Sequence, residues 1–196
     1  MNATLIIPAA LLILAFGYAI SLYNSLVRKR QRCLNALSQI DVQLKRRRDL
    51  IPNLIHAVKG YMAHEKETLS SLARARETAS AAAGAAMAAP GAAAPLAELA
   101  GAESALSLGL GRLLARVEAY PELKAGQNML ALQEELSSTE NKVGFARQAY
   151  NDAAQAYNTA REFFPAALAA GPLGFHRFEF LSFEGVEFKQ LPKVDF

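Results

Sequence analysis

The chain of 196 residues is long enough for one domain with a substantial core. It is rich in Ala and lacks Trp, its one cysteine excludes an intramolecular disulfide, and its three histidines lie too far apart to indicate a metal cluster. The net charge of +3 is unevenly distributed: residues 1–50 carry eight Lys or Arg against two Asp, a net +6, which leaves −3 for the remainder.

The first segment, "ATLIIPAALLILAFGYAISLY", has about 21 residues without a charge, enough for a helix to cross a hydrocarbon layer of roughly 30 Å. The alternative is a cleaved signal peptide, but the start "MNAT" has no cationic residue. We therefore expect an uncleaved anchor. Within it, Gly17 and Ser21 form a small-xxx-small pair that would let two helices approach closely in lipid.

Four basic residues follow the anchor: Arg28, Lys29, Arg30 and Arg32. Positive charge beside a transmembrane helix favours the cytosolic side and anionic headgroups. The sequence predicts a single-pass protein of a bacterial inner membrane, with its N-terminus outside and its C-terminal domain in the cytoplasm.

Beyond the anchor, apolar residues recur at spacings of three and four from Leu37 to Leu72, which predicts an amphipathic helix continuous with the anchor and kinked at Pro52. This helix contains a run of four basic residues within its apolar repeat: Lys45, Arg46, Arg47 and Arg48. Arg47 falls on the apolar face itself, so a carboxylate partner is expected.

The acids considered as partners of Arg47 belong to the last long helix: Glu134, Glu135 and Glu140. Arg46 and Arg48 are expected to face outward, toward lipid or a partner protein. The alternative is that all four basic residues of the run are simply solvated.

Residues 78–95 are rich in Ala and contain Pro90-Gly91, which predicts two helix ends that meet at a hairpin tip. This tip is either an ordinary low-complexity loop or a surface for self-association or membrane contact. A shorter helix is expected from about Leu96 to Ala119, with an inner face of Leu99, Leu106, Leu110, Leu113, Leu114 and Val117.

A second apolar series indicates a long helix that starts near Pro121 and stops near Pro165. Its members are Met129, Leu132, Leu136, Thr139, Val143, Ala146, Tyr150, Ala153, Tyr157, Ala160 and Phe164. The following stretch, rich in Phe, is expected to lie extended on the bundle.

The fold class predicted is therefore all-α: an N-terminal transmembrane helix that continues into an elongated antiparallel bundle of three to four long helices, with an extended Phe-rich tail. The expected divisions are residues 1–24 for the anchor, 25–165 for the bundle and 166–196 for the tail.

Reactive groups do not converge in the sequence. "HEKET", from His64, lacks the second His of a zinc-protease motif, and "GLGLGR" lacks the strand and Lys-Ser/Thr pair of a nucleotide loop. Cys33, His56 and His176 stand alone. We therefore expect no enzyme activity and no cofactor. We also expect no nucleic-acid partner, because the aromatic residues that could stack on bases lie far in sequence from the basic runs.

The blocks "QIDVQLKRRRDLIPNL" and "YPELKAGQNMLALQEELSSTEN" closely resemble the bacterial LemA family over nearly the whole chain. The resemblance implies an anchored, mainly helical cytosolic domain without established catalysis, and relatives linked to membrane organisation, including magnetosome membranes, or encoded near membrane proteases. Here the tip is richer in Ala and Pro than is usual in the family. Ala166 and Ala167 also replace the polar Asn residues common after Phe164-Pro165.

The function expected is that of a non-enzymatic scaffold that self-associates and organises membrane or partner proteins. A regulatory adaptor for a membrane enzyme, such as a membrane protease, is the alternative. The partners considered are membrane lipid, further copies of the chain and a membrane protein.

Overall fold

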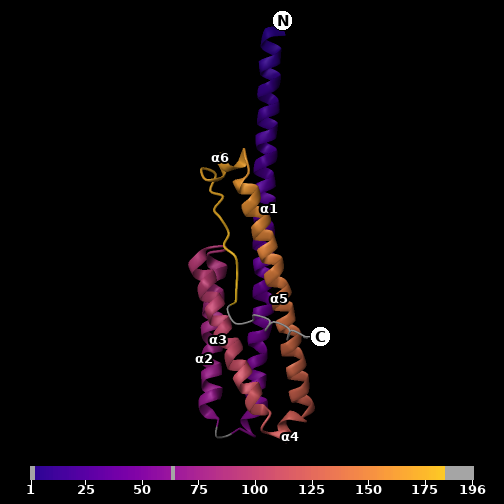
Figure 1. Cartoon of the computed structure of the whole chain (residues 1–196), viewed down its shortest axis with the longest axis vertical. Coiled ribbons are helices and arrows are strands. Elements are labelled where there is room, and N and C mark those ends of the chain that lie inside the picture. The colour runs from indigo at the N-terminus through magenta and orange to yellow at the C-terminus, as the bar shows by residue number, and fades with distance from the viewer. Residues whose placement is uncertain (1–2, 63–64, 184–196) are drawn as a thin grey trace, which may run out of the picture.

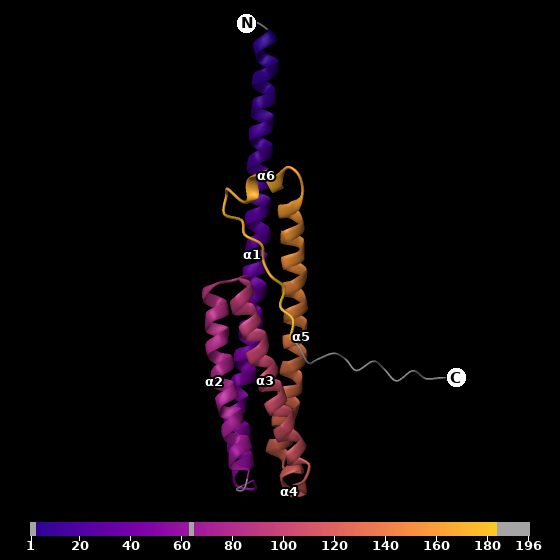
Figure 2. The ribbon, with the colours of Figure 1, turned by 60° about the vertical axis from the view of Figure 1, so that its left-hand side comes forward.

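The computed structural model describes residues 3–62 and 65–183, and helices are the only regular secondary structure in these ranges. In chain order they are α1 (Ala3–Lys59), α2 (Lys66–Ala88), α3 (Ala93–Val117), α4 (Pro121–Lys124), α5 (Gln127–Glu162) and α6 (Ala166–Ala170). The four long helices lie side by side and α1 projects beyond the others (Figures 1 and 2). The predicted tail from residue 184 onward, and His64, lie outside the described residues.

Helix α1 has 57 residues and is about 85 Å long at 1.5 Å per residue. Its N-terminal part is the one helix among the described residues that is long and apolar enough to cross a membrane. Large apolar side chains from Ile7 to Tyr23 are exposed there, whereas Leu26 is the first buried residue of the inner face. The same helix therefore carries an uncovered apolar span and a buried core face.

The first helix ends earlier than the apolar spacing predicted. It continues through Pro52, but it stops at Lys59, and Leu69 and Leu72 belong to α2. The Met62 N–H bonds to the Val58 carbonyl at 2.9 Å, and the Met62 side chain is buried where the chain reverses. The prediction of one helix was wrong because the chain reverses after Lys59, so that the apolar faces of α1 and α2 can pack on each other. The apolar spacing is the same with or without this reversal, so the spacing alone does not reveal it.

The two helix ends predicted for residues 78–95 meet at the expected place, between Ala88 and Ala93. Gly91 has φ 79°, in the left-handed region that glycine adopts without strain. The inner face of α2 near the tip consists of small residues that allow close packing against α3: Ala79, Ala82, Ala83 and Ala86.

Helix α3 agrees closely with the predicted span, and its inner-face leucines are buried, apart from Leu114, which is partly buried. The last long helix begins later than predicted, because Pro121 starts the single turn α4 and α5 begins only at Gln127. It also ends earlier. Phe164, placed on the inner face by its spacing, is 82% exposed, since Phe163 before it is already extended and the residue preceding Pro165 disfavours helix.

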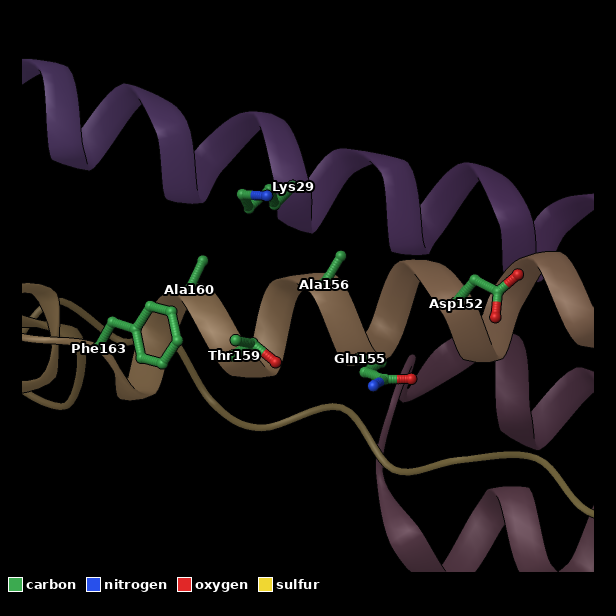
Figure 3. Close-up of a pocket in the computed structure, with 7 residues that line it drawn as sticks. All are labelled: Lys29, Asp152, Gln155, Ala156, Thr159, Ala160 and Phe163. Carbon is green, nitrogen blue, oxygen red and sulfur yellow. The ribbon is translucent and has the colours of Figure 1, made fainter.

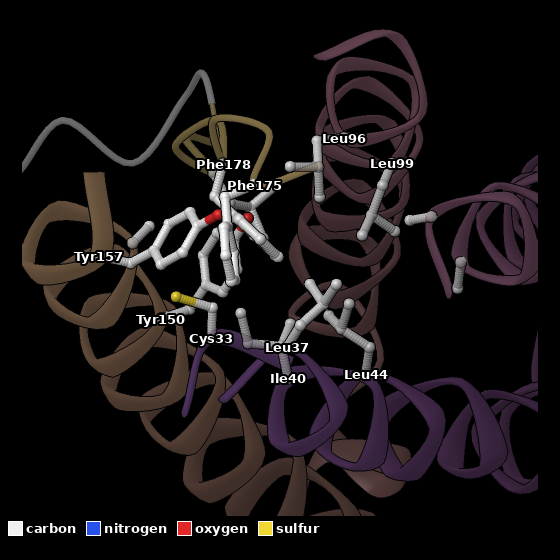
Figure 4. Packing of buried hydrophobic residues seen from close by; sticks show 14 of the residues in the cluster. Cys33, Leu37, Ile40, Leu44, Leu96, Leu99, Tyr150, Tyr157, Phe175 and Phe178 are labelled. Atoms are coloured by element: carbon white, nitrogen blue, oxygen red, sulfur yellow. The ribbon is translucent and has the colours of Figure 1, made fainter. Parts of the chain in front are cut away.

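Helix α5 packs mainly on α1, and α3 packs mainly on α2. After α6 the chain runs extended through residues 175–183 and covers one of the two buried apolar clusters. Figure 4 shows this cluster: Tyr150 and Tyr157 of α5, Cys33 and Leu37 of α1 and Leu96 of α3 converge with Phe175 and Phe178. The second cluster lies farther from the anchor and includes Ile51, Leu72, Leu113 and Met129.

Candidate functional site

A buried layer of charges lies between the two apolar clusters. Along α1, Leu44 belongs to the first cluster and Ile51 to the second, and Arg47 and Arg48 lie between them. Arg47 is 2% exposed and Arg48 6% exposed, although each residue rotates the helix by about 100°. Two adjacent positions are buried because helices cover this part of α1 on more than one side.

Arg47 joins three helices. Its guanidinium forms ion pairs with Glu103 of α3 and Glu140 of α5, and it donates to the Ser107 hydroxyl at 3.1 Å. Glu140 is one of the three acids considered from the sequence. Glu103, which is 1% exposed, was missed. The signal was present, because Glu103 occupies the inner-face register of α3 between Leu99 and Leu106, where a lone acid requires a partner.

Arg48 corrects the expectation that it faces outward. Its guanidinium donates to Glu103 Oε1 at 2.9 Å and lies 3.4 Å from Asp41 Oδ1. The Arg48 carbonyl also accepts a hydrogen bond from Arg76 Nε of α2 at 2.9 Å. Glu103 therefore serves both arginines, which offsets the desolvation that burial of a single carboxylate would cost.

The other two residues of the basic run are exposed. Arg46 Nε donates to Glu135 Oε1 of α5 at 2.7 Å, and Lys45 faces outward. The pair of Arg46 and Glu135 is partly solvated, so it contributes little to stability, at most about 1 kcal/mol. The four neighbouring basic residues thus divide into a buried pair and an exposed pair.

The four basic residues after the anchor surround α1 near the point where it enters the bundle. Arg28, Arg30 and Arg32 are exposed, and Lys29 is half-buried. Lys29 lines a shallow pocket of about 480 Å³ between α1 and α5, with Asp152, Gln155, Ala156, Thr159, Ala160 and Phe163 (Figure 3). The pocket combines one amine and one carboxylate with small side chains, and it contains no nucleophile paired with a base.

The small residues of the anchor are open to a partner. Gly17 and Ser21 are both exposed, and a Cβ added to Gly17 would meet nothing within 4 Å. This face of α1 leaves room for another helix to approach the backbone.

Side chains of α5 bind the backbone of the extended segment. Asn158 bonds to both the N–H and the carbonyl of Phe178, at 3.0 and 2.7 Å, and Asn151 bonds in the same way to Leu181, at 2.9 and 3.0 Å. The spacing of the two asparagines matches the spacing of the residues they bind. Asn151 and Asn158 are seven helical residues apart, a rise of about 10.5 Å, and Phe178 and Leu181 are three extended residues apart, a span of about 10 Å.

Two tyrosines reinforce this attachment. The Tyr150 hydroxyl donates to the Glu179 carbonyl at 2.8 Å, and the Tyr157 hydroxyl donates to the His176 carbonyl at 2.9 Å. Burial raises the pKa of both phenols above the ordinary value of 10.0. Sequence reasoning missed this set, although the repeated Tyr-Asn pairs at 150–151 and 157–158 were visible.

The isolated reactive residues stay apart. Cys33 is fully buried, and burial raises the pKa of its thiol from the ordinary value of 9.0 to about 11. His56 and His176 are exposed on different elements. Over residues 3–62 and 65–183, no group of three or more His, Cys, Asp or Glu is placed to hold a metal ion.

Two relatives resemble this chain. The protein LemA of Metamycoplasma hominis is 27% identical over 136 residues, which cover 69% of this chain and 58% of that protein. The magnetosome protein MamQ of Magnetospirillum gryphiswaldense is 23% identical over 173 residues, covering 81% of this chain and 64% of that protein. The chain thus spans less than two thirds of either relative.

The model of the LemA family matches residues 36–196, a range that contains the buried charge layer and the Tyr-Asn pairs of α5. Together with the apolar first helix and the similarity to a magnetosome protein, this match indicates a membrane-associated protein. The chain belongs to the LemA family.

Proposed function

We propose that this protein is a single-pass, membrane-anchored scaffold that self-associates and organises membrane or partner proteins without catalysing a reaction. The observation that carries the proposal is the continuity of α1, whose exposed apolar span and buried inner face belong to one helix of 57 residues. A continuous helix transmits the position of the anchor to the body without a flexible linker.

The buried charge layer supports a mechanical role. Arg47 and Arg48 of α1 share Glu103 of α3, and Arg47 also binds Glu140 of α5. These contacts fix three helices at one level, because a buried ion pair tolerates little displacement of its partners. The two arginines and their acids are paired with each other, and this arrangement favours a rigid structural layer over a catalytic centre.

The orientation proposed has the N-terminus outside and the helical body in the cytoplasm of a bacterial cell, as the basic residues after the anchor favour. A reporter enzyme that is active only outside the cytoplasm, fused after residue 196, should remain inactive. Activity of that fusion would reverse the orientation.

Self-association is tested on the full chain in detergent by light scattering. The small residues of α1 would form the contact, so Gly17→Leu should reduce the assembled fraction. Ala19→Leu, about 200° around the same helix, should not. A protein that is monomeric at every concentration would contradict self-association.

Crosslinking in membranes separates the scaffold from a regulatory adaptor. Phe180 is exposed on the extended segment and accepts a photoreactive side chain without disturbing the core. The scaffold predicts that the crosslinked product is mainly a second copy of this chain. One dominant heterologous membrane enzyme would favour the adaptor.

A further inference from the structure

The connection from α5 to α6 and the turn after α6 expose several large apolar side chains. Phe163, Phe164, Leu168 and Leu173 are all more than half exposed, and Phe164 reaches 82%. Exposed residues of this size on one short segment, here called the α6 cap (residues 163–173), are unusual on a surface that faces only water.

The α6 cap lies beside the base of the apolar span (Figures 1 and 2). Ala166 and Ala170 on the inner face of α6 are buried in the same cluster as Leu26 of α1, and Leu22 packs against that cluster. Just after the cap, the Phe175 ring contacts the Tyr23 ring edge-on, with centroids 5.5 Å apart. The large apolar side chains of the cap therefore lie outside this contact.

The depth of the α6 cap relative to the membrane follows from its position along α1. The Phe175 ring, just after the cap, meets Tyr23 at the end of the uncharged span, and α6 lies where α1 leaves the bundle (Figures 1 and 2). If the span fills the hydrocarbon core of roughly 30 Å, residues 22–26 lie in the headgroup layer, which adds about 5–8 Å on each side. Interfacial helices insert their apolar faces about 5–10 Å into this boundary.

The surrounding charges suit the same location. Arg28 and Arg32 are exposed one to three turns beyond Leu22, on the side of the body. Glu162, the acid nearest the cap, faces two arginines, Arg161 at 3.6 Å and Arg177 at 3.4 Å. The cap is thus bordered by cationic groups, which anionic headgroups attract.

A protein partner fits the cap less well. Four side chains of this size and exposure offer roughly 500 Å², below the ~800 Å² per partner of a standard stable interface. The cap also lies beside the span that would be in lipid, where a partner would have to displace headgroups. A bilayer requires no minimum area, since each exposed apolar group contributes separately.

We propose that the α6 cap is a second membrane contact, in which Phe164 and Leu168 insert into the headgroup boundary of the leaflet nearest the helical body. The contact rests on the proposed anchoring by α1. A transmembrane helix by itself leaves the body free to tilt and to rotate about the helix axis. A second contact beside it removes that freedom and presents one fixed face of the bundle along the membrane.

The experiment uses the absence of Trp from the sequence. Three variants of the full chain each receive one Trp: Phe164→Trp in the cap, Leu14→Trp in the span and Phe145→Trp on α5 away from the cap. Phe145 is 73% exposed, similar to Phe164 and Leu168, so it is a matched control for solvent access. Each variant is reconstituted in phosphatidylcholine–phosphatidylglycerol nanodiscs with or without brominated acyl chains, and quenching of Trp fluorescence is measured.

The expected result is a loss of fluorescence and a blue-shifted emission for Phe164→Trp and Leu14→Trp, and neither for Phe145→Trp. Quenching of Leu14→Trp without quenching of Phe164→Trp would overturn the second contact and leave the anchor intact. Equal quenching of Phe145→Trp and Phe164→Trp would also overturn it, because the whole body would then lie on the bilayer. No quenching of Leu14→Trp would overturn the anchoring, and the second contact with it.

Discussion

At the scale of single residues, burial rather than charge count determines what each basic residue does. Arg46 and Arg47 are adjacent in the chain and both form ion pairs with acids of α5, but Arg46 is solvated and Arg47 is not. An exposed pair is screened by water, whereas a buried pair cannot lose one partner without leaving an uncompensated charge.

This difference predicts the stability of two matched variants. Arg47→Met should lower the free energy of unfolding by about 3–5 kcal/mol, because the buried Glu103 then retains only Arg48, whereas the half-exposed Glu140 can be solvated. Arg46→Met should cost less than about 1 kcal/mol. Urea unfolding of the full chain in detergent, followed by circular dichroism, measures both. Equal stability of the two variants would show that the buried layer does not stabilise the bundle.

Cys33 provides a second test at this scale. Burial raises the pKa of its thiol to about 11, so little reactive thiolate is present in the folded protein near pH 8. Iodoacetamide should label the folded chain much more slowly than the chain in urea. The lone cysteine makes the readout specific to this site. Equally fast labelling in both states would contradict the burial of Cys33.

The same pKa shift gives a direction for stability against pH. A folded-state pKa above the unfolded value favours the protonated native form. The stability that this thiol contributes is therefore complete below pH 9.0 and is lost as the pH rises through about 11.

At the scale of elements, the tip between α2 and α3 depends on the extended segment. Gly91 accepts a hydrogen bond from the Glu179 N–H at 3.0 Å, and a Cβ added to Gly91 would lie 2.4 Å from the Phe178 ring. The glycine therefore meets two requirements: a positive φ and close approach of an aromatic ring.

Two glycine substitutions should consequently change stability in opposite directions. Gly91→Ala should destabilise the fold by more than the ~1–2 kcal/mol of left-handed strain, because Phe178 must also move. Gly84→Ala, on the exposed face of α2 one turn before its end and with no atom near the new Cβ, should stabilise by up to about 1 kcal/mol. Thermal unfolding of both variants measures the signs, and a neutral Gly91→Ala would contradict the tight contact.

At the scale of the whole molecule, residues 175–183 connect parts that are distant in sequence. The segment binds Asn151 and Asn158 of α5 on one side and Gly91 of the tip on the other. Its Phe178 ring packs against Tyr157, with centroids 5.3 Å apart. It thereby joins α5 to the hairpin of α2 and α3.

Loss of one amide should loosen this connection. Asn158→Asp keeps the acceptor for the Phe178 N–H but removes the donor to the Phe178 carbonyl and adds a buried charge. A cost of about 1–3 kcal/mol corresponds to roughly 5- to 150-fold more local opening. Trypsin should then cleave after Arg177 correspondingly faster, as followed by mass spectrometry.

Gln155→Glu is the matched control for this variant. It makes the same amide-to-acid change at an exposed position of α5. Its cleavage after Arg177 should match that of the unmodified chain. Equal cleavage of Asn158→Asp and Gln155→Glu would show that the amide does not retain the segment.

The sequence by itself determined the features that depend on local periodicity and composition. The apolar span, the α3 inner face and the break at Pro90-Gly91 follow from spacing of three and four, from the absence of charge and from residues that cannot continue a helix. It also indicated that Arg47, lying on an apolar face, needs a carboxylate.

Only the tertiary structure decided which groups meet across the bundle. The reversal after Lys59, the sharing of Glu103 by Arg47 and Arg48, and the attachment of residues 175–183 to Asn151 and Asn158 all join positions far apart in the chain. Helical periodicity specifies which face of each helix is buried. The partner of that face depends on how the helices pack, and hence on the free energy of burying all of the faces together.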